Sequence, residues 1–181
     1  HIAMNTLPLS LPAVLLAVLL GGCMPDLKSD LPPDRVYWLE VPQIADPPGV
    51  DLRLSVVPGL DSDRIWLLQQ DQRLNFYAGA YWPDNLRPLL ESLLLRSLDA
   101  RPDGAEMVVL VERFFAVEVG SGVLSDVEVR ALLESAGTRC RFEHIGSLEG
   151  DRLRDVVAGH QSALEALADA VAGFARSGRC P

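Results

Sequence analysis

The stretch "EMVVLVERFFAVEV", residues 106–119, decides the fold because it predicts one long strand near the middle of a sheet. Its apolar side chains follow a period of two, which is typical of a strand. The stretch is apolar enough in its middle to be covered by neighbouring elements, as expected of a central strand. The turn-forming residues "RPDG" at 101–104 come just before it.

The segment before this strand, "WPDNLRPLLESLLLRSLDA" at 82–100, predicts an amphipathic helix. Its leucines recur at intervals of three and four and draw one stripe along a helix. Pro88 falls in the first turn, where a backbone N–H has no partner within the helix to lose. Because Leu95 widens the stripe, we expect this helix to lie flat on a sheet.

Four shorter stretches nearer the N-terminus predict further strands. They are rich in β-formers or alternate apolar with polar residues, and turn-forming residues separate them. They are "RVYWLEV" (35–41), "DLRLSVV" (51–57), "RIWLLQQ" (64–70) and "RLNFYAGAY" (73–81).

Residues 125–137, "SDVEVRALLESAG", admit two interpretations. A strand would place alternate valine, alanine and leucine side chains on one face. A helix would begin with a capping box of Ser125 and Glu128 and would end at Gly137. We favour the strand, and we expect residues 138–144 to form another one after it.

The closing segment predicts the clearest helix. From Leu153 to Phe174, apolar residues step by three or four along one face, which includes His160. Acidic residues in the first turn and Arg176 in the last turn complement the helix dipole, and Gly178 is a plausible stop.

The order of strands, helix, strands and helix predicts one domain of the α+β class over residues 35–181. We expect a mostly antiparallel sheet with the two amphipathic helices packed on it.

The N-terminal stretch "VLLAVLLGGCMPD", residues 14–26, resembles a bacterial lipoprotein signal. The charge-free apolar segment 7–20 is short for a membrane-spanning helix and is interrupted by prolines. The Gly-Gly-Cys that follows is typical of a lipobox, because the peptidase needs small residues before the cut and only a thiol accepts the lipid. We expect residues 1–22 to be a signal peptide and Cys23 to be lipidated; the alternative is an anchor helix that ends in Gly-Gly-Cys.

Cleavage there would leave residues 23–34 as a polar, proline-containing tether. The net charge of −9 argues against nucleic acid and against docking on anionic headgroups, which favour clusters of Lys and Arg. Membrane contact should come from acyl chains on Cys23, which contribute about 0.8 kcal/mol per buried CH₂. Met24, in place of the Asp associated with inner-membrane retention, points by resemblance to the outer membrane, with the domain facing the periplasm.

Cys140 and Cys180 remain as a pair once Cys23 carries lipid. In an oxidising compartment we predict a disulfide, closing a loop of about 40 residues and contributing roughly 4 kcal/mol in the chain-entropy model. The alternative is two unpaired cysteines. Neither has a second Cys or His at ligand spacing, so we predict no metal site.

The sequence contains no residue pattern typical of an enzyme. It lacks the G-x-S-x-G elbow of hydrolases and the G-x-x-x-x-G-K-[ST] loop that binds ATP. His144 and His160 are more typical of edge or core histidines than of catalysis. Asp61 and Asp63 are more typical of turn capping than of a weak cation site. We therefore predict a non-catalytic protein without a cofactor.

Trp66, Tyr77, Tyr81 and Trp82 form the aromatic cluster outside the first predicted strand. One interpretation is packing of the first helix on the sheet. The sharper hypothesis is that Tyr81 or Trp82, near Asp61, belongs to a partner-binding edge, because aromatic residues are enriched among interface anchors.

Several motifs, taken in order, resemble the ABC-type transport auxiliary lipoproteins, the PqiC-like family. The matching segments are "YWL" (37–39), "LDSDRI" (60–65), "WPDNL" (82–86), "VLVERF" (109–114) and the closing helix. The family's Leu-Asp-x-x-x-Ile segment is matched at Leu60, Asp61 and Ile65, and its Trp-x-Asp/Glu-x-Leu segment at Trp82, Asp84 and Leu86. The resemblance covers nearly the whole mature domain.

This resemblance implies a non-catalytic accessory at the outer membrane. Members of the family work beside MCE-domain lipid transporters, in which an inner-membrane permease and ATPase drive lipid through a periplasmic MCE assembly. The implied partner is the MCE component, and a homo-oligomer is conceivable because MCE proteins form rings. Two alternatives stay open: an envelope-assembly lipoprotein that binds a peptidoglycan synthase or an outer-membrane barrel protein, and a lipid-anchored hydrolase that uses His144 or His160.

Overall fold

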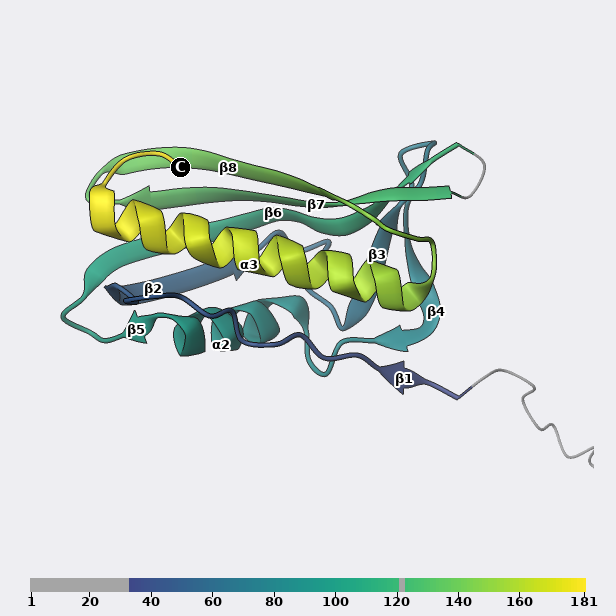
Figure 1. Ribbon diagram of the computed structural model, residues 1–181, viewed down its shortest axis with the longest axis horizontal. Helices are drawn as coiled ribbons and strands as arrows, with labels where there is room; N and C mark the ends of the chain where they lie inside the picture. Colours follow the sequence, from purple (N-terminus) through teal and green to yellow (C-terminus); the bar gives the residue numbers. More distant parts are fainter. Residues whose placement is uncertain (1–32, 121–122) are drawn as a thin grey trace, which may run out of the picture. The chain divides into compact units, whose positions relative to one another are not determined.

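A long central strand organises the domain, as predicted from residues 106–119 (Figure 1). This computed structural model describes residues 33–120 and 123–181. The elements in chain order are β1 (Arg35–Val36), β2 (Gly49–Val56), β3 (Arg64–Leu68), β4 (Leu74–Tyr81), α2 (Leu86–Ser97), β5 (Asp99–Ala100), β6 (Ala105–Val119), β7 (Val123–Ser135), β8 (Thr138–Ser147) and α3 (Leu153–Ser177). The predicted signal peptide, most of the predicted tether and the predicted lipid site at Cys23 lie outside the described residues.

The central strand β6 has different partners on its two edges. Along one edge it pairs with β7, which continues into β8. Along the other edge it pairs first with β2, from Val50 opposite Ala105, and then with β3, where Leu67 lies opposite Ala116. The hairpin partner β4 and the short β1 extend the sheet beyond β3, and β5 extends it beyond β2.

The α+β class is confirmed, whereas the prediction of a mostly antiparallel sheet is wrong. The sheet is mixed: β6 runs parallel to both β2 and β3, and β1 runs parallel to β4. Among the strands that the structure describes, only the β3–β4, β6–β7 and β7–β8 pairs are antiparallel. The reason is the route of the chain, because the β3–β4 hairpin and α2 carry it back to the starting end of β2 before β6 begins.

The first predicted strand, 35–41, is regular only at Arg35–Val36. Val36 lies opposite Tyr81, the last residue of β4, and Tyr37 still donates its N–H to the carbonyl oxygen of Tyr81 at 2.8 Å. Because β4 ends there, the chain beyond Tyr37 has no neighbouring strand with which to form a ladder.

The ambiguous stretch 125–137 lies in a strand, as we favoured, since β7 covers it as far as Ser135. Gly137 is the second residue of the two-residue turn between Ser135 and Thr138, where Ala136 and Gly137 have φ values of 48° and 79°. Positive φ at both positions is what such a hairpin turn requires. Gly137 is therefore a turn residue and not a helix stop.

Both predicted helices are present and cover one face of the sheet. α3 packs on β6, β7 and β8, and α2 packs on β2, as the ribbon shows (Figure 1). Side chains on the covered face are buried; they include Leu52, Leu54, Met107, Val109, Val129 and Leu133. The predicted stop of the closing helix is confirmed, because Gly178 caps α3 in the left-handed conformation with φ of 63°.

The opposite face of the sheet is open to solvent and carries ion pairs between neighbouring strands. Arg113 lies 2.7 Å from Glu128, and Arg139 lies 2.7 Å from Glu134. An exposed pair such as that of Arg139 and Glu134 contributes about 0–1 kcal/mol. These pairs keep this part of the outer face polar.

Candidate interaction surface

An arginine lies between two aromatic rings on the outer face of the β3–β4 hairpin. The guanidinium carbon of Arg64 is 4.5 Å from the ring centroid of Phe76 and 4.7 Å from that of Tyr81. Trp66 meets Phe76 edge to face, with 6.0 Å between ring centroids. We call these four residues the hairpin aromatic cluster.

The pairing register of the two strands brings this cluster together. Arg64 lies opposite Tyr81 and Trp66 lies opposite Phe76, so two steps along β3 correspond to five along β4. The extra residues on β4 include Gly79, whose φ of 69° suits a glycine at an irregular position. Without them the aromatic ring of Tyr81 would not face Arg64.

The cluster is partly exposed. Phe76 is 39 % exposed, and 33 % of the Arg64 side chain is accessible. Cation–π contacts contribute about 0.5–1 kcal/mol each at exposed sites, so they hold Arg64 in place against the rings. Arginine and aromatic residues are also the types most enriched in protein interfaces, and the cluster is therefore suited to binding a protein partner.

Tyr81, one of the predicted partner-binding residues, lies in this cluster and is half-buried. Trp82 does not, and its predicted role at a partner-binding edge is wrong. Its side chain is only 3 % exposed and its ring centroid lies 5.3 Å from that of His160 in the core. Successive residues of an extended chain point to opposite sides, so an outward Tyr81 is followed by an inward Trp82.

Asp61, the third predicted partner-binding residue, caps a helix. Its Oδ1 accepts a hydrogen bond of 2.9 Å from the backbone N–H of Arg87, in the first turn of α2. The first N–H groups of a helix have no partner within it, and an acidic side chain there also favours the helix dipole. This contact gives Asp61 a structural role.

Two of the segments that resemble the family, 60–65 and 82–86, form one joint. Besides the Asp61 contact, the N–H of Trp82 donates to the carbonyl of Asp63 at 2.7 Å, and the N–H of Leu86 donates to the carbonyl of Ser62 at 3.0 Å. The apolar motif residues Leu60, Ile65, Trp82 and Leu86 are all buried. The joint fixes where α2 begins relative to the start of β3.

His160 is fully buried between the rings of Trp82 and Phe114. A carbonyl oxygen can only accept, so Nδ1–H of His160 must donate to the carbonyl of Val156, 2.8 Å away. Nε2 has no hydrogen-bond partner among the described residues. Burial lowers the pKa of His160 to about 4, so the ring is neutral near pH 7.

His144 lies on β8, opposite Val129. Its Nε2 is buried and, within the described part of the chain, has no hydrogen-bond partner. Val129 is fully buried on the face that packs on α3, so His144 is on the covered side of the sheet. Neither His144 nor His160 belongs to the hairpin aromatic cluster.

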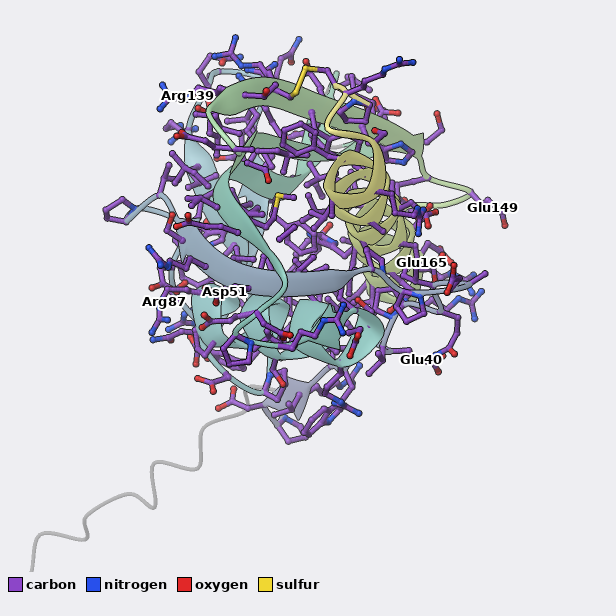
Figure 2. The ribbon with its side chains drawn as sticks, turned by 90° about the vertical axis from the view of Figure 1, so that its left-hand side faces the viewer. Glu40, Asp51, Arg87, Arg139, Glu149 and Glu165 are labelled. Carbon is purple, nitrogen blue, oxygen red and sulfur yellow. A yellow bond between two sulfur atoms is a disulfide. The ribbon has the colours of Figure 1, made fainter. Side chains whose placement is uncertain are left out.

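Cys140 and Cys180 are joined by a disulfide, with 5.4 Å between their Cα atoms. Cys140 lies on the covered face of β8 and Cys180 follows the end of α3, so the bond fastens the C-terminal tail to the sheet (Figure 2).

Within residues 33–120 and 123–181, no three His, Cys, Asp or Glu side chains gather in a way that could hold a metal ion. Over the same residues, no helix combines the length and apolar character needed to cross a membrane.

Comparison with known proteins finds similar solved structures and no match by sequence. The sequence matches no protein-family model and no curated protein. The fold is similar to a crystal structure of protein XCC0632 from Xanthomonas campestris, described as DUF330, with a TM-score of 0.63 and 20 % identity. That match covers 80 % of this chain and 96 % of the other.

A second similar structure is that of an uncharacterized protein, with a TM-score of 0.59 and 15 % identity. This match covers 82 % of this chain and 100 % of the other. At these identities the two likenesses show a shared fold.

Proposed function

We propose that this chain is a non-catalytic outer-membrane lipoprotein, anchored through Cys23 and facing the periplasm. In this proposal it engages the MCE component of an ABC-type lipid transport system. The sequence resemblance to the auxiliary lipoproteins suggests the class of partner, and the structure offers the surface.

The observation that carries the proposal is the hairpin aromatic cluster. Enzyme and cofactor sites are usually concave, with a few convergent polar groups. Here Arg64 lies between Phe76 and Tyr81 on an open sheet face, at 4.5 Å and 4.7 Å from their centroids. The stacked rings hold the guanidinium in a fixed direction while part of it stays accessible, which suits the anchor of a protein interface.

The joint beneath the cluster supports a role in positioning. Asp61 and the backbone of Ser62 and Asp63 connect the start of β3 to the start of α2. Arg64 and Tyr81 adjoin these contacts directly in the chain. A rigid support lowers the conformational entropy lost when a partner binds.

The test is site-specific crosslinking of the full chain in intact cell envelopes. A photoreactive amino acid replaces Phe76, and captured proteins are identified by mass spectrometry. We expect an MCE-domain protein. The matched control carries the same group at Arg139, whose side chain is 64 % exposed. Arg139 is the second residue of β8, and β8 begins at the other end of the sheet from the β3–β4 hairpin (Figure 1).

A second measurement uses Tyr81→Ala and Tyr81→Phe. Interface anchors cost about 2 kcal/mol or more on truncation, so Tyr81→Ala should reduce co-purified MCE protein at least tenfold, whereas Tyr81→Phe keeps the ring and the yield. Unchanged co-purification with unchanged thermal stability would remove Tyr81 from the interface. Recovery of a peptidoglycan synthase or barrel protein, with no MCE, permease or ATPase component, would overturn the proposal in favour of the envelope-assembly alternative.

A further inference from the structure

Trp38 is exposed on a segment whose backbone is held on both sides. On one side the N–H of Tyr37 donates to the carbonyl of Tyr81 at 2.8 Å. On the other, the N–H of Glu40 donates to Oε1 of Gln161 at 2.8 Å, and Nε2 of Gln161 donates back to the Glu40 carbonyl at 3.3 Å. The fold therefore holds the backbone around Trp38 in place and presents its indole, which is 73 % exposed, to solvent.

Neighbouring side chains extend this apolar surface. Leu39 is 5 % exposed and Tyr37 packs against the core, so Val36 and Trp38 point away from it. Val36 is 54 % exposed. Large exposed apolar groups that lie together mark interaction sites more often than single ones do.

A groove of about 230 Å³ adjoins Trp38, between its segment and α2. Pro83, Pro88 and Leu89 contribute much of its apolar wall. Among the described residues that line it, one is acidic, Asp84, and one is basic, Arg96. The groove thus has no net charge, although the chain as a whole carries −9.

The position of this surface along the chain indicates what covers it. Trp38 is fifteen residues after Cys23. A chain of that length spans at most about 50 Å when fully extended. If Cys23 is acylated, the Trp38 surface is kept within that distance of a bilayer, and its local concentration there is high.

We propose that Val36, Trp38 and the adjoining groove dock on the headgroup layer of the membrane that anchors the chain. This inference rests on the lipid anchor at Cys23 in the proposed function. An indole suits that layer because its body is apolar and its N–H can donate to a headgroup. A neutral groove suits it because acidic surfaces are repelled by anionic lipids.

Docking also orients the domain. Val36 lies opposite Tyr81 in the sheet, so a fixed contact at Val36 and Trp38 sets the height of the hairpin aromatic cluster above the bilayer. The tether then limits the distance between the domain and the bilayer, and the contact at Val36 and Trp38 sets the orientation of the domain on the bilayer.

The test uses the mature, acylated full chain in vesicles of phosphatidylethanolamine with a minor share of phosphatidylglycerol. Some of the lipids carry bromine on the acyl chains near the headgroup, where it quenches tryptophan emission. The chain has three tryptophans. We expect emission to fall on brominated vesicles for the parent protein and for Trp66→Phe, and to be unchanged for Trp38→Phe.

The matched control, Trp66, lies on the hairpin and donates its Nε1–H to the carbonyl of Leu60 at 3.1 Å. Flotation of the vesicles in a density gradient reports whether the chain is bound to them. If the chain floats with the vesicles but the tryptophan emission of the parent protein is not quenched, the docking inference is overturned while the anchor stands. If the chain does not float, the anchor fails and the inference fails with it. Shielding of Trp38 that follows protein concentration without lipid would identify a second copy of the chain as the occupant and would also overturn it.

Discussion

The carboxylate of Asp61 accepts a hydrogen bond from the backbone N–H of Arg87 at 2.9 Å, so a residue 26 positions earlier caps the first turn of α2. Removing a helix cap typically costs about 1 kcal/mol. We expect Asp61→Ala to lower the free energy of unfolding by about that amount in urea denaturation, and Asp61→Asn, which can still accept the bond, to lower it less.

The matched control for this prediction is Asp63→Ala. The Asp63 carboxylate is 49 % exposed and lies 3.8 Å from Arg64, and an exposed pair contributes little. Equal losses for Asp61→Ala and Asp63→Ala would contradict a capping role for Asp61.

His160 makes stability depend on pH. Well above pH 6.5 its ring is neutral in both the folded and the unfolded chain. As pH falls from 6.5 toward about 4, the unfolded chain binds a proton that the buried ring does not, and stability is lost. With about 1.4 kcal/mol for each unit of pKa difference, the loss should reach roughly 3 kcal/mol.

The measurement compares the parent with His160→Leu, which has the same carboxylates but no titrating ring. Denaturation at several pH values should show the stability of His160→Leu rising relative to the parent between pH 6.5 and about 4. If the free energies of unfolding of the two proteins change with pH in parallel, His160 is not the source of the pH dependence.

Two glycines of α3 should respond in opposite directions to alanine. A Cβ on Gly159 would lie 2.5 Å from Cδ2 of Leu148 and 2.8 Å from Cγ2 of the buried Val127, whereas a Cβ on Gly173 meets nothing within 4 Å. Overpacking costs about 1–3 kcal/mol, and alanine exceeds glycine in helix propensity by about 1 kcal/mol. In thermal unfolding, the melting temperature of Gly159→Ala should be lower than that of the parent, and the melting temperature of Gly173→Ala should be higher. The reverse order would refute the close approach of α3 to β7.

The disulfide should contribute most of its stabilisation through the unfolded chain. A cross-link across a loop of 40 residues is worth roughly 4 kcal/mol in the chain-entropy model. We expect the double variant Cys140→Ala, Cys180→Ala to lose about that much free energy of unfolding. Reductant should lower the free energy of unfolding of the parent to that of the double variant and leave the variant unchanged. A parent whose stability does not respond to reductant would argue against the disulfide.

Lipidation of Cys23 has a direct chemical test. A Cys23→Ser variant cannot form the thioether, so it should lose labelling by a radioactive fatty acid and accumulate uncleaved. A Cys23→Ser chain that is processed normally and stays in the membrane would refute the lipoprotein signal.

Periodicity predicted the elements that bury a single face. In α2, β6 and α3 the spacing of apolar residues within the segment itself shows whether it is a helix or a strand. Side chains at alternate positions of a strand, or three and four apart in a helix, lie on the face that meets the core. The stretch 125–137 was ambiguous because Ser125 and Glu128 also suit a capping box and Gly137 a helix stop, and the strand β7 with its hairpin turn at Ala136 and Gly137 decides it.

The parallel pairs could not be predicted in the same way. Whether β6 lies beside β7 alone or also beside β2 depends on the path of the chain through α2, and that path leaves no local pattern. For the same reason the partner of Arg64 was not apparent. Tyr81 lies opposite Arg64 only because β4 contains extra residues around Gly79, and no spacing in the sequence gives that register.

The opposite directions of Tyr81 and Trp82 follow from the same register. From the sequence, Tyr81 and Trp82 are predicted at the end of a strand, but the pattern does not indicate which of the two faces the core. Burial of Trp82 against His160 assigns the inward side to Trp82 and leaves Tyr81 with Arg64.

The two end-to-end partners of β6 have a consequence for how the chain reaches this fold. β7 and β8 follow β6 directly in the chain. By contrast, β2 pairs with β6 from Val50 opposite Ala105, and these two residues are 55 positions apart. Loop-closure entropy and high contact order slow such pairing. A ribosome delivers β2 before β6, so the apolar residues of β2 lack their long partner strand until β6 emerges, whereas β3 can already pair with β4. This interval is when the chain most needs protection from aggregation.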